Sequence, residues 1–243
     1  MSNLIIFDLD GVLIDSKDIH FNALNKALAD IDKRYFINKE LHLKTFDGLP
    51  TLKKLEILSS TLNLPISKHE EIFNRKQEYT HQEFSLLNKD QGLIDLFNLI
   101  KGKGIKIAVA SNCIRKSVQI ALVRLEIIEY VDYLVSSEDV FRRKPYPECY
   151  WKCMIACDSL PLSTVIFEDS HVGRTAAKTS KAHLIPVDDR THLNENLINK
   201  AFKLLEIAPP TPWIDPNLNV LIPMAGEGPR FSKAGYTFPK PLI

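Results

Sequence analysis

Two aspartates near the amino terminus, Asp8 and Asp10, follow directly after an apolar run at residues 4–7. Side chains two residues apart in an extended chain point the same way, so these two carboxylates would face one place. Gly11 then allows the backbone to turn. Carboxylates held this close repel each other unless a cation lies between them, and Mg²⁺ is a hard ion that prefers oxygen ligands. The pattern indicates a magnesium site, although Asp-x-Asp-Gly could also be an ordinary polar turn.

Two later apolar runs also end in polar residues, which favours the metal interpretation. Residues 105–110 stop at Ser111-Asn112, and residues 164–167 stop at Glu168-Asp169. Short, wholly apolar runs are typical of strands buried in a parallel sheet. Because the carboxyl ends of such strands lie along one edge, where ligands bind, we expect the three polar endings to meet there.

The elements that position these residues alternate along the chain. Helical spacing is expected at 93–100, 117–125, 150–157 and 173–180, and further short strands at 133–135 and 184–187. This order predicts an α/β fold, a Rossmann-like doubly wound parallel sheet formed by residues 1–16 and 89–208. Residues 17–88 carry helical patterns without a strand pattern, which predicts an inserted all-helical cap.

Four short motifs occur in a fixed order: Asp8-Leu9-Asp10-Gly11-Val12, Ser111-Asn112, Lys144-Pro145 and Glu168-Asp169-Ser170. Together they resemble the motifs of the haloacid dehalogenase-like (HAD) hydrolase superfamily, closest to its beta-phosphoglucomutase-like branch. The likeness covers roughly the first 190 residues. Val12 departs from the threonine that the family often carries, although valine also occurs there.

The resemblance implies a role for each motif residue. Asp8 would attack phosphorus and form an aspartyl-phosphate, while Asp10 would act as acid and then as base. Ser111 would bind a phosphoryl oxygen with Asn112 beside it, and Lys144 would balance negative charge. The implied cofactor is Mg²⁺, held by Asp8, the Asp10 carbonyl, Asp169 and, as a helper, Glu168. The two acids at 168 and 169 could instead cap a helix.

Two segments of the insertion resemble parts of the family's cap that face the substrate. In residues 15–20 the histidine, His20, would face the acid/base aspartate; a partly buried helix residue is the alternative. Residues 46–51 are similar to the cap's specificity loop, so Gly48 and Thr51 are predicted to bind substrate. A plain helix–helix turn, with Pro50 entering the next helix, would give the same pattern.

Composition limits the remaining choices. With 243 residues, 45% of them hydrophobic and 25% charged, the chain can bury one sizeable core and a second small one. A formal net charge of +1 does not favour a nucleic-acid or membrane partner. No apolar stretch approaches the ~20 residues of a membrane-spanning helix, and the first core strand starts too early to leave room for a signal peptide. We therefore expect a cytoplasmic protein. The family resemblance implies that its partner is a small phosphorylated metabolite.

The four cysteines agree with a reducing compartment. Cys149, Cys153 and Cys157 recur every four residues, a spacing that matches no zinc or disulfide pattern, so they are predicted to be core residues. Cys113 is predicted to pack in the same way.

The last stretch departs from this fold. Residues 209–218 are rich in proline and indicate an extended linker. Residues 219–243 resemble the opening motif of sugar-phosphate nucleotidyltransferases. By this resemblance Gly226, Gly228, Arg230 and Lys240 would be vestigial nucleotide-binding positions, without activity here. One strand and one loop cannot bury a core. The segment is thus predicted to be the incomplete start of a nucleotidyltransferase domain from a longer bifunctional protein; a frayed tail is the alternative.

The favoured function is a Mg²⁺-dependent phosphatase for a small phosphorylated metabolite, with a sugar phosphate preferred because of the tail's resemblance. A beta-phosphoglucomutase-like phosphomutase would use the same residues and return the phosphoryl group to a sugar hydroxyl. A third hypothesis is a non-catalytic partner domain of a nucleotide-sugar enzyme. Such a domain would be expected to lack a nucleophile or a metal ligand, and every such position is filled here.

Overall fold

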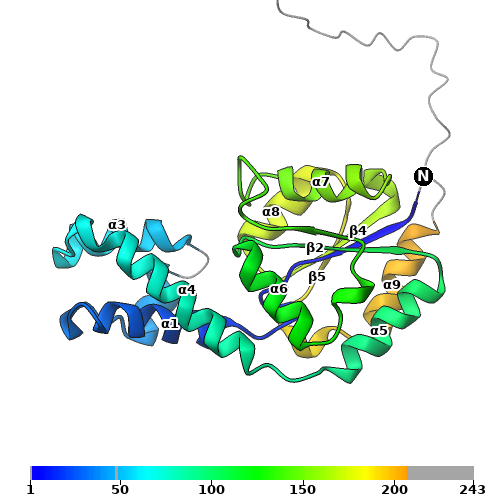
Figure 1. Cartoon of the computed structure of the whole chain (residues 1–243). Helices are drawn as coiled ribbons and strands as arrows, with labels where there is room; N and C mark the ends of the chain where they lie inside the picture. Colours follow the sequence, from blue (N-terminus) through cyan, green and yellow to red (C-terminus); the bar gives the residue numbers. More distant parts are fainter. Residues whose placement is uncertain (1, 47–48, 207–243) are drawn as a thin grey trace, which may run out of the picture. The chain divides into compact units, whose positions relative to one another are not determined.

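The computed structural model describes residues 2–46 and 49–206 (Figure 1). Five parallel strands form one sheet in the order β3-β2-β1-β4-β5, with bounds β1 Leu4–Phe7, β2 Lys106–Ala110, β3 Tyr133–Val135, β4 Thr164–Glu168 and β5 His183–Pro186. β1 lies in the centre, and Leu4 is in register with both Lys106 and Thr164. The predicted parallel α/β sheet is therefore confirmed.

Helices cover both faces of this sheet, which explains why β1 is apolar at every position. Ile5 and Phe7 belong to the larger core, on the face covered by α5 Gln91–Gly102, α6 Arg115–Arg124 and α9 Glu195–Leu205 (Figure 1). Leu4 and Ile6 belong to a second core, on the face covered by α7 Glu148–Ala156 and α8 His171–Ser180. The alternation follows from the two-residue period of a strand.

The described part of the insertion is helical, as predicted. It contains α1 Lys17–Ala29, α2 Lys39–Leu41, a π-helical turn at His42–Phe46, α3 Thr51–Leu62 and α4 His69–Ser85. Leu24, Leu28, Leu55 and Leu58 belong to its own small hydrophobic core, separate from the two cores of the sheet. The insertion therefore packs around its own centre and can present one face to the strand ends.

Short 3-10 helices connect the larger elements at Lys33–Tyr35, Ile66–Lys68, Ile128–Tyr130, Pro161–Ser163 and Arg190–His192. Helix α9 was not predicted, although its buried residues Ile198, Ala201, Phe202 and Leu205 have helical spacing. Cys149, Cys153 and Cys157 are buried in the second core and form no disulfide, so their predicted packing role is confirmed. Within residues 2–46 and 49–206, no helix has the length and apolarity needed to cross a membrane.

The chain divides into the units Met1–Ile207 and Ala208–Ile243. The predicted linker at 209–218 and the nucleotidyltransferase segment at 219–243 both fall in the second unit, outside the described residues. Both stay predictions, as do the positions assigned there to Gly226, Gly228, Arg230 and Lys240.

Candidate active site

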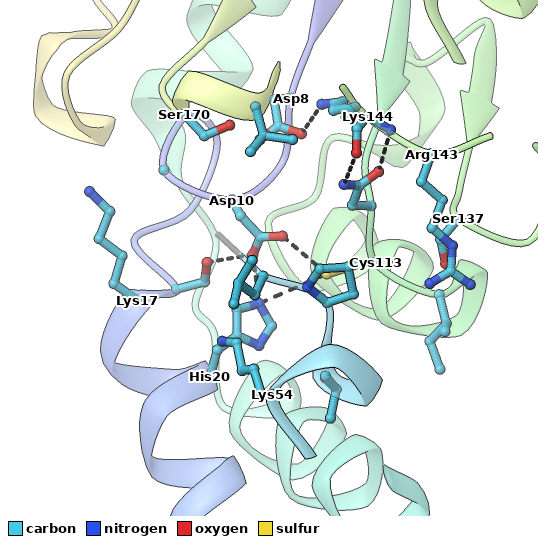
Figure 2. A pocket seen from close by; sticks show the side chains of 18 of the residues that line it. Asp8, Asp10, Lys17, His20, Lys54, Cys113, Ser137, Arg143, Lys144 and Ser170 are labelled. Carbon is cyan, nitrogen blue, oxygen red and sulfur yellow. Dashed lines mark hydrogen bonds and ion pairs between the residues drawn. The ribbon is translucent and has the colours of Figure 1, made fainter. Parts of the chain in front are cut away.

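The polar residues that end β1 and β4 meet at a cavity of about 470 Å³. The sheet side contributes Asp8, Asp10, Lys144 and Asp169, and the helical insertion contributes residues from α1, from α3 and from α4 (Figure 2). A cavity of this size suits a small metabolite. The prediction that the polar endings of three strands meet in one place is confirmed, because Asp8, Asn112 and Asp169 all line the cavity.

A buried lysine holds the strand ends together. The Nζ atom of Lys144 lies 2.7 Å from Oδ1 of Asp8, 2.7 Å from Oε1 of Glu168 and 2.9 Å from the Ala110 carbonyl oxygen. Burial opposes the charge on Lys144, but the carboxylates of Asp8 and Glu168 outweigh it and hold the lysine pKa well above its usual value. One ammonium group thus donates hydrogen bonds to residues that follow or end three strands.

Asp8 itself is nearly buried beside this lysine. Burial raises the pKa of Asp8 well above its ordinary value, Lys144 acts in the opposite direction, and the charges of Glu168 and Asp10 raise it further. A second cation at the carboxylates would relieve this repulsion.

Glu168 is engaged entirely by protein groups. Its Oε1 accepts hydrogen bonds from Lys144 and from the Tyr150 hydroxyl at 3.2 Å. Its Oε2 accepts from the Ser170 amide at 3.0 Å and from the Ser170 hydroxyl at 3.1 Å. Oxygens of Asp8, Glu168 and Asp169 lie within 4.8 Å of one another and could hold a metal ion. Since the Glu168 carboxylate already has four partners, Asp8 and Asp169 are the carboxylates of this group better placed to bind one.

Glycine is required where α8 begins beside Glu168. A Cβ atom built on Gly173 would lie 1.6 Å from Oε1 of Glu168, so Gly173→Ala must displace a buried, hydrogen-bonded carboxylate. We expect this variant to lose about 1–3 kcal/mol of unfolding free energy, measured by urea denaturation. Gly102→Ala is the control because a Cβ atom there meets nothing within 4 Å, and its stability should be unchanged or slightly higher. Equal stability of the two variants would contradict the close packing of Gly173.

The half-buried Asp169 faces Gly11, where an added Cβ atom would lie 2.0 Å from its Oδ2. Burial, with the charge of Glu168, raises the pKa of Asp169 to about 6. Compared with the unfolded chain, the folded protein without metal therefore favours the protonated acid of Asp169, and this carboxyl group makes folding less favourable as pH rises from about 4 through 6.

In EDTA, Asp169→Asn is accordingly expected to raise the melting temperature at pH 7, with a gain that shrinks toward zero near pH 4. Thermal unfolding at several pH values measures this. Asp188→Asn, at a side chain that is 80% exposed, should show no such pH-dependent gain. A gain for Asp169→Asn that grows on acidification would contradict the raised pKa.

Asp10 lines the same cavity and is held by residues that enter the insertion. Ser16 donates a hydrogen bond to Oδ1 of Asp10, and Nε2 of His20 lies 2.9 Å from the same oxygen. Burial alone would raise the pKa of Asp10, but His20, Ser16 and Cys113 together hold it below its usual range. His20 thus faces Asp10, in the position that the resemblance implied.

Lys76 on α4 fixes the tautomer of His20. Its Nζ lies 3.2 Å from Nδ1 of His20, and an ammonium group can only donate, so Nε2 carries the proton and donates to Asp10. Burial lowers the pKa of Lys76 as well as that of His20. Sequence analysis missed Lys76, although a signal existed: Ile72, Lys76, Thr80 and Phe84 are spaced by four and form the buried stripe of α4, so the lysine is the one charged member.

Cys113 was assigned to packing, and that assignment was incomplete. The residue does lie against the larger core, but its Sγ is 3.0 Å from Oδ2 of Asp10 and it lines the cavity (Figure 2). Its place two residues after Ser111 put it at the same strand edge, which was the available signal. Burial raises the pKa of this thiol well above its ordinary value, and the charge of Asp10 adds to the effect.

The other residues predicted for the site differ in whether they line the cavity. Ser111 is buried, and its hydroxyl accepts a hydrogen bond from the Cys113 amide at 2.9 Å. Asn112 lines the cavity and accepts from the Lys144 amide at 3.2 Å, so it also holds the loop that carries the lysine. Thr51 lines the cavity, as does Arg143, which was not among the predicted site residues. Gly48 lies outside the described residues.

The site combines a buried lysine paired with one carboxylate and a histidine paired with a second carboxylate. A helical insertion faces both pairs across the cavity, as expected for a hydrolase site on a Rossmann-like sheet. Residues 5–187 match the family model described as haloacid dehalogenase-like hydrolase, so the chain belongs to that family. The matched range includes every described site residue named above, from Asp8 to Ser170.

Two known proteins with similar sequences are named as a phosphatase and a pyrophosphatase. The chain is 32% identical over 182 residues to a phosphorylated carbohydrates phosphatase of Thermotoga maritima, covering 72% of this chain and 80% of the relative. It is 25% identical to the pyrophosphatase PpaX of Bacillus mycoides, covering 70% and 75%. The structure of beta-phosphoglucomutase from Clostridium difficile is similar in fold, with a TM-score of 0.70, 19% identity and coverage of 84% and 98%.

Proposed function

We propose that this protein is a Mg²⁺-dependent phosphatase that removes the phosphoryl group from a small phosphorylated carbohydrate through an aspartyl-phosphate. The observation that carries the proposal is the pairing of Asp8 with Lys144 beside Asp169, at a cavity partly lined by the helical insertion. A phosphate monoester is a dianion, so a carboxylate can approach it only where cations neutralise both groups.

The donor set fits Mg²⁺. The carboxylates of Asp8 and Asp169 supply hard oxygen ligands. Burial, with the charges of neighbouring carboxylates, raises the pKa of each, and a bound cation would offset both effects. We assign the metal to these two groups and to the Asp10 carbonyl, and we assign Glu168 to Lys144 as its counter-ion. When bound, Mg²⁺ neutralises charge on the phosphoryl oxygens and on the attacking carboxylate.

The residues of the chain carry the steps themselves. Asp8 attacks phosphorus, the bond to the leaving oxygen breaks, and Asp10 gives that oxygen its proton. Asp10, now a carboxylate, then takes a proton from the water that cleaves the aspartyl-phosphate. The hydrogen bonds from Ser16 and His20 favour the carboxylate form of Asp10, which is the form that takes the proton from water. In the earlier step, the negative charge of a bound phosphate raises the pKa of Asp10, so that it can hold the proton that the leaving oxygen needs.

The substrate class follows from the lining of the cavity. Lys54 and Lys76 of the insertion and Arg143 of the sheet side supply positive charge, while Thr51, Asn112 and Gln77 supply neutral hydrogen-bonding groups. This mixture suits a polyhydroxylated anion better than an apolar ester. The Thermotoga relative, which is named for phosphorylated carbohydrates, supports the same class.

The test is phosphate release from a panel of sugar phosphates, pyrophosphate and a generic aryl phosphate, with 5-fold steps of Mg²⁺ and with EDTA. We expect metal-dependent release that is fastest with a sugar phosphate. Conversion of one sugar phosphate isomer into another, dependent on a sugar bisphosphate primer, would instead indicate the phosphomutase. Absence of both reactions in a folded protein would overturn the enzymatic proposal for these substrates.

A further inference from the structure

Three side chains of different chemistry meet beside the carboxylates assigned to Mg²⁺. The Nε2 atom of His20 lies 2.9 Å from Oδ1 of Asp10, the Sγ atom of Cys113 lies 3.0 Å from Oδ2 of Asp10, and Sγ and Nε2 are 3.8 Å apart. Figure 2 shows the three side chains turned toward one another. All three line the cavity, so a solute that enters the cavity can reach them.

These donors form a ligand set for a thiophilic cation. The set offers one oxygen, one nitrogen and one sulphur atom, which all lie within 4.8 Å of one another. These are the kinds of atom that bind Zn²⁺ in proteins. Zinc bonds of about 2.0–2.3 Å in a tetrahedral arrangement place ligand atoms about 3.3–3.6 Å apart. The separations of 2.9, 3.0 and 3.8 Å lie around that value, so small side-chain adjustments would admit the ion. A fourth position would remain for water.

The neighbouring group of carboxylates differs from this set in its ligand atoms, and ligand type decides whether a site prefers Mg²⁺ or Zn²⁺. Asp8 and Asp169 offer only oxygen, which suits Mg²⁺, whereas Cys113 and His20 offer the softer ligands that favour Zn²⁺ over Mg²⁺. Asp10 takes part in both groups through different atoms, because its backbone carbonyl is assigned to Mg²⁺ and its side chain to the second set. The two cations can therefore be present together.

We propose that Asp10, His20 and Cys113 form a second cation site, selective for Zn²⁺ over Mg²⁺, whose occupation inhibits the enzyme. Binding replaces the thiol proton of Cys113 and the Nε2 proton of His20. Nδ1 of His20 then takes a proton from Lys76, and two protons leave to solvent. The Asp10 carboxylate, now bound to the ion, can no longer donate or accept a proton. This inhibitory consequence rests on the proposed phosphatase function, whereas the binding of the ion does not.

Binding can be tested without activity by using Co²⁺ as a spectroscopic probe with saturating Mg²⁺ present. We expect a thiolate-to-cobalt absorption band in the wild-type protein, reversed by added Zn²⁺ and absent from Cys113→Ala. Cys157→Ala is the matched control, because this buried cysteine of the second core should leave the band intact. A band that persists in Cys113→Ala, or no band in the wild type, would overturn the site.

A second variant changes affinity in the opposite direction. The Nζ atom of Lys76 donates to the imidazole that must bind the ion, so its positive charge opposes occupation. Lys76→Met is expected to tighten Zn²⁺ binding by at least about tenfold in competition with a chelating dye. Unchanged or weaker binding in a folded Lys76→Met protein would contradict the location of the site.

Inhibition is tested on phosphate release with saturating Mg²⁺. Zinc should inhibit the wild-type enzyme, further Mg²⁺ should not restore the rate, and Cys113→Ala should need at least about tenfold more zinc, relative to its own uninhibited rate. Equal sensitivity of the two proteins, relieved by Mg²⁺, would place the zinc at Asp8 and Asp169 and overturn the proposal. A preparation without phosphatase activity contradicts the proposed function, but a Cys113-dependent cobalt band in that preparation still supports the cation site.

Discussion

Asp8→Asn is expected to reduce the rate of phosphate release by on the order of 10³-fold or more, because a carboxamide oxygen is a far weaker nucleophile than a carboxylate. The variant should nevertheless fold. Burial disfavours the negative charge of Asp8, and the substitution removes that charge while keeping the shape of the side chain. Its melting temperature in EDTA should equal or exceed that of the wild type.

The measurement is the steady-state rate on the best sugar phosphate, together with thermal unfolding of the same preparations. Asp188→Asn, at an exposed side chain, provides the matched control and should keep the full rate. A folded Asp8→Asn protein that retains more than a small fraction of the wild-type rate would rule out Asp8 as the nucleophile.

Lys144→Met is expected to be the most destabilising single change at the site. The substitution leaves Asp8 and Glu168 buried beside each other without the ammonium group that both contact at 2.7 Å. Removing one partner of a buried ion pair costs about 3–5 kcal/mol of unfolding free energy, because an uncompensated charge stays behind. Phosphate release should also fall, since the attacking carboxylate loses its counter-charge.

Urea denaturation measures the loss of unfolding free energy, provided that the dependence on urea concentration has the same slope in each variant. Lys178→Met, at an exposed position of α8, is the control and should stay near wild-type stability. The double variant Lys144→Met with Glu168→Gln should recover part of the loss, because it removes one of the unpaired charges. Additive losses in the double variant would mean that the lysine and the glutamate act independently, contrary to the geometry.

The sheet could be predicted from sequence because both of its faces are buried. Residues 4–7, 105–110 and 164–167 are apolar at nearly every position, and this pattern marks a strand covered on two sides without knowledge of its neighbours. The edge of the sheet that carries the site could also be predicted, because each of these apolar runs stops at polar residues. Helix α9 also had a clear apolar stripe, so its omission was a missed pattern and not a lack of information.

The surroundings of Asp10 were harder to predict because they depend on contacts between distant elements. Lys76 reaches His20 from α4 to α1, and Cys113 reaches Asp10 from the loop after β2. A buried lysine and a cysteine are compatible with several environments, and their local sequence does not tell which partner they meet. Likewise, two of the four hydrogen bonds of Glu168 come from Ser170 at the start of α8, which the strand pattern alone did not define.

The order of the strands in the sheet has a consequence for how the protein is made. β1 leaves the ribosome before the other strands of this sheet, and both of its neighbours, which pair with Leu4 through Lys106 and Thr164, are synthesised much later. The insertion has its own core from nearby residues and can fold while the chain is still growing. The helical insertion can therefore fold before the sheet does, while the central strand still lacks both of its neighbours. Only after β4 has emerged can Lys144 contact Glu168, so catalytic competence arises late in biosynthesis.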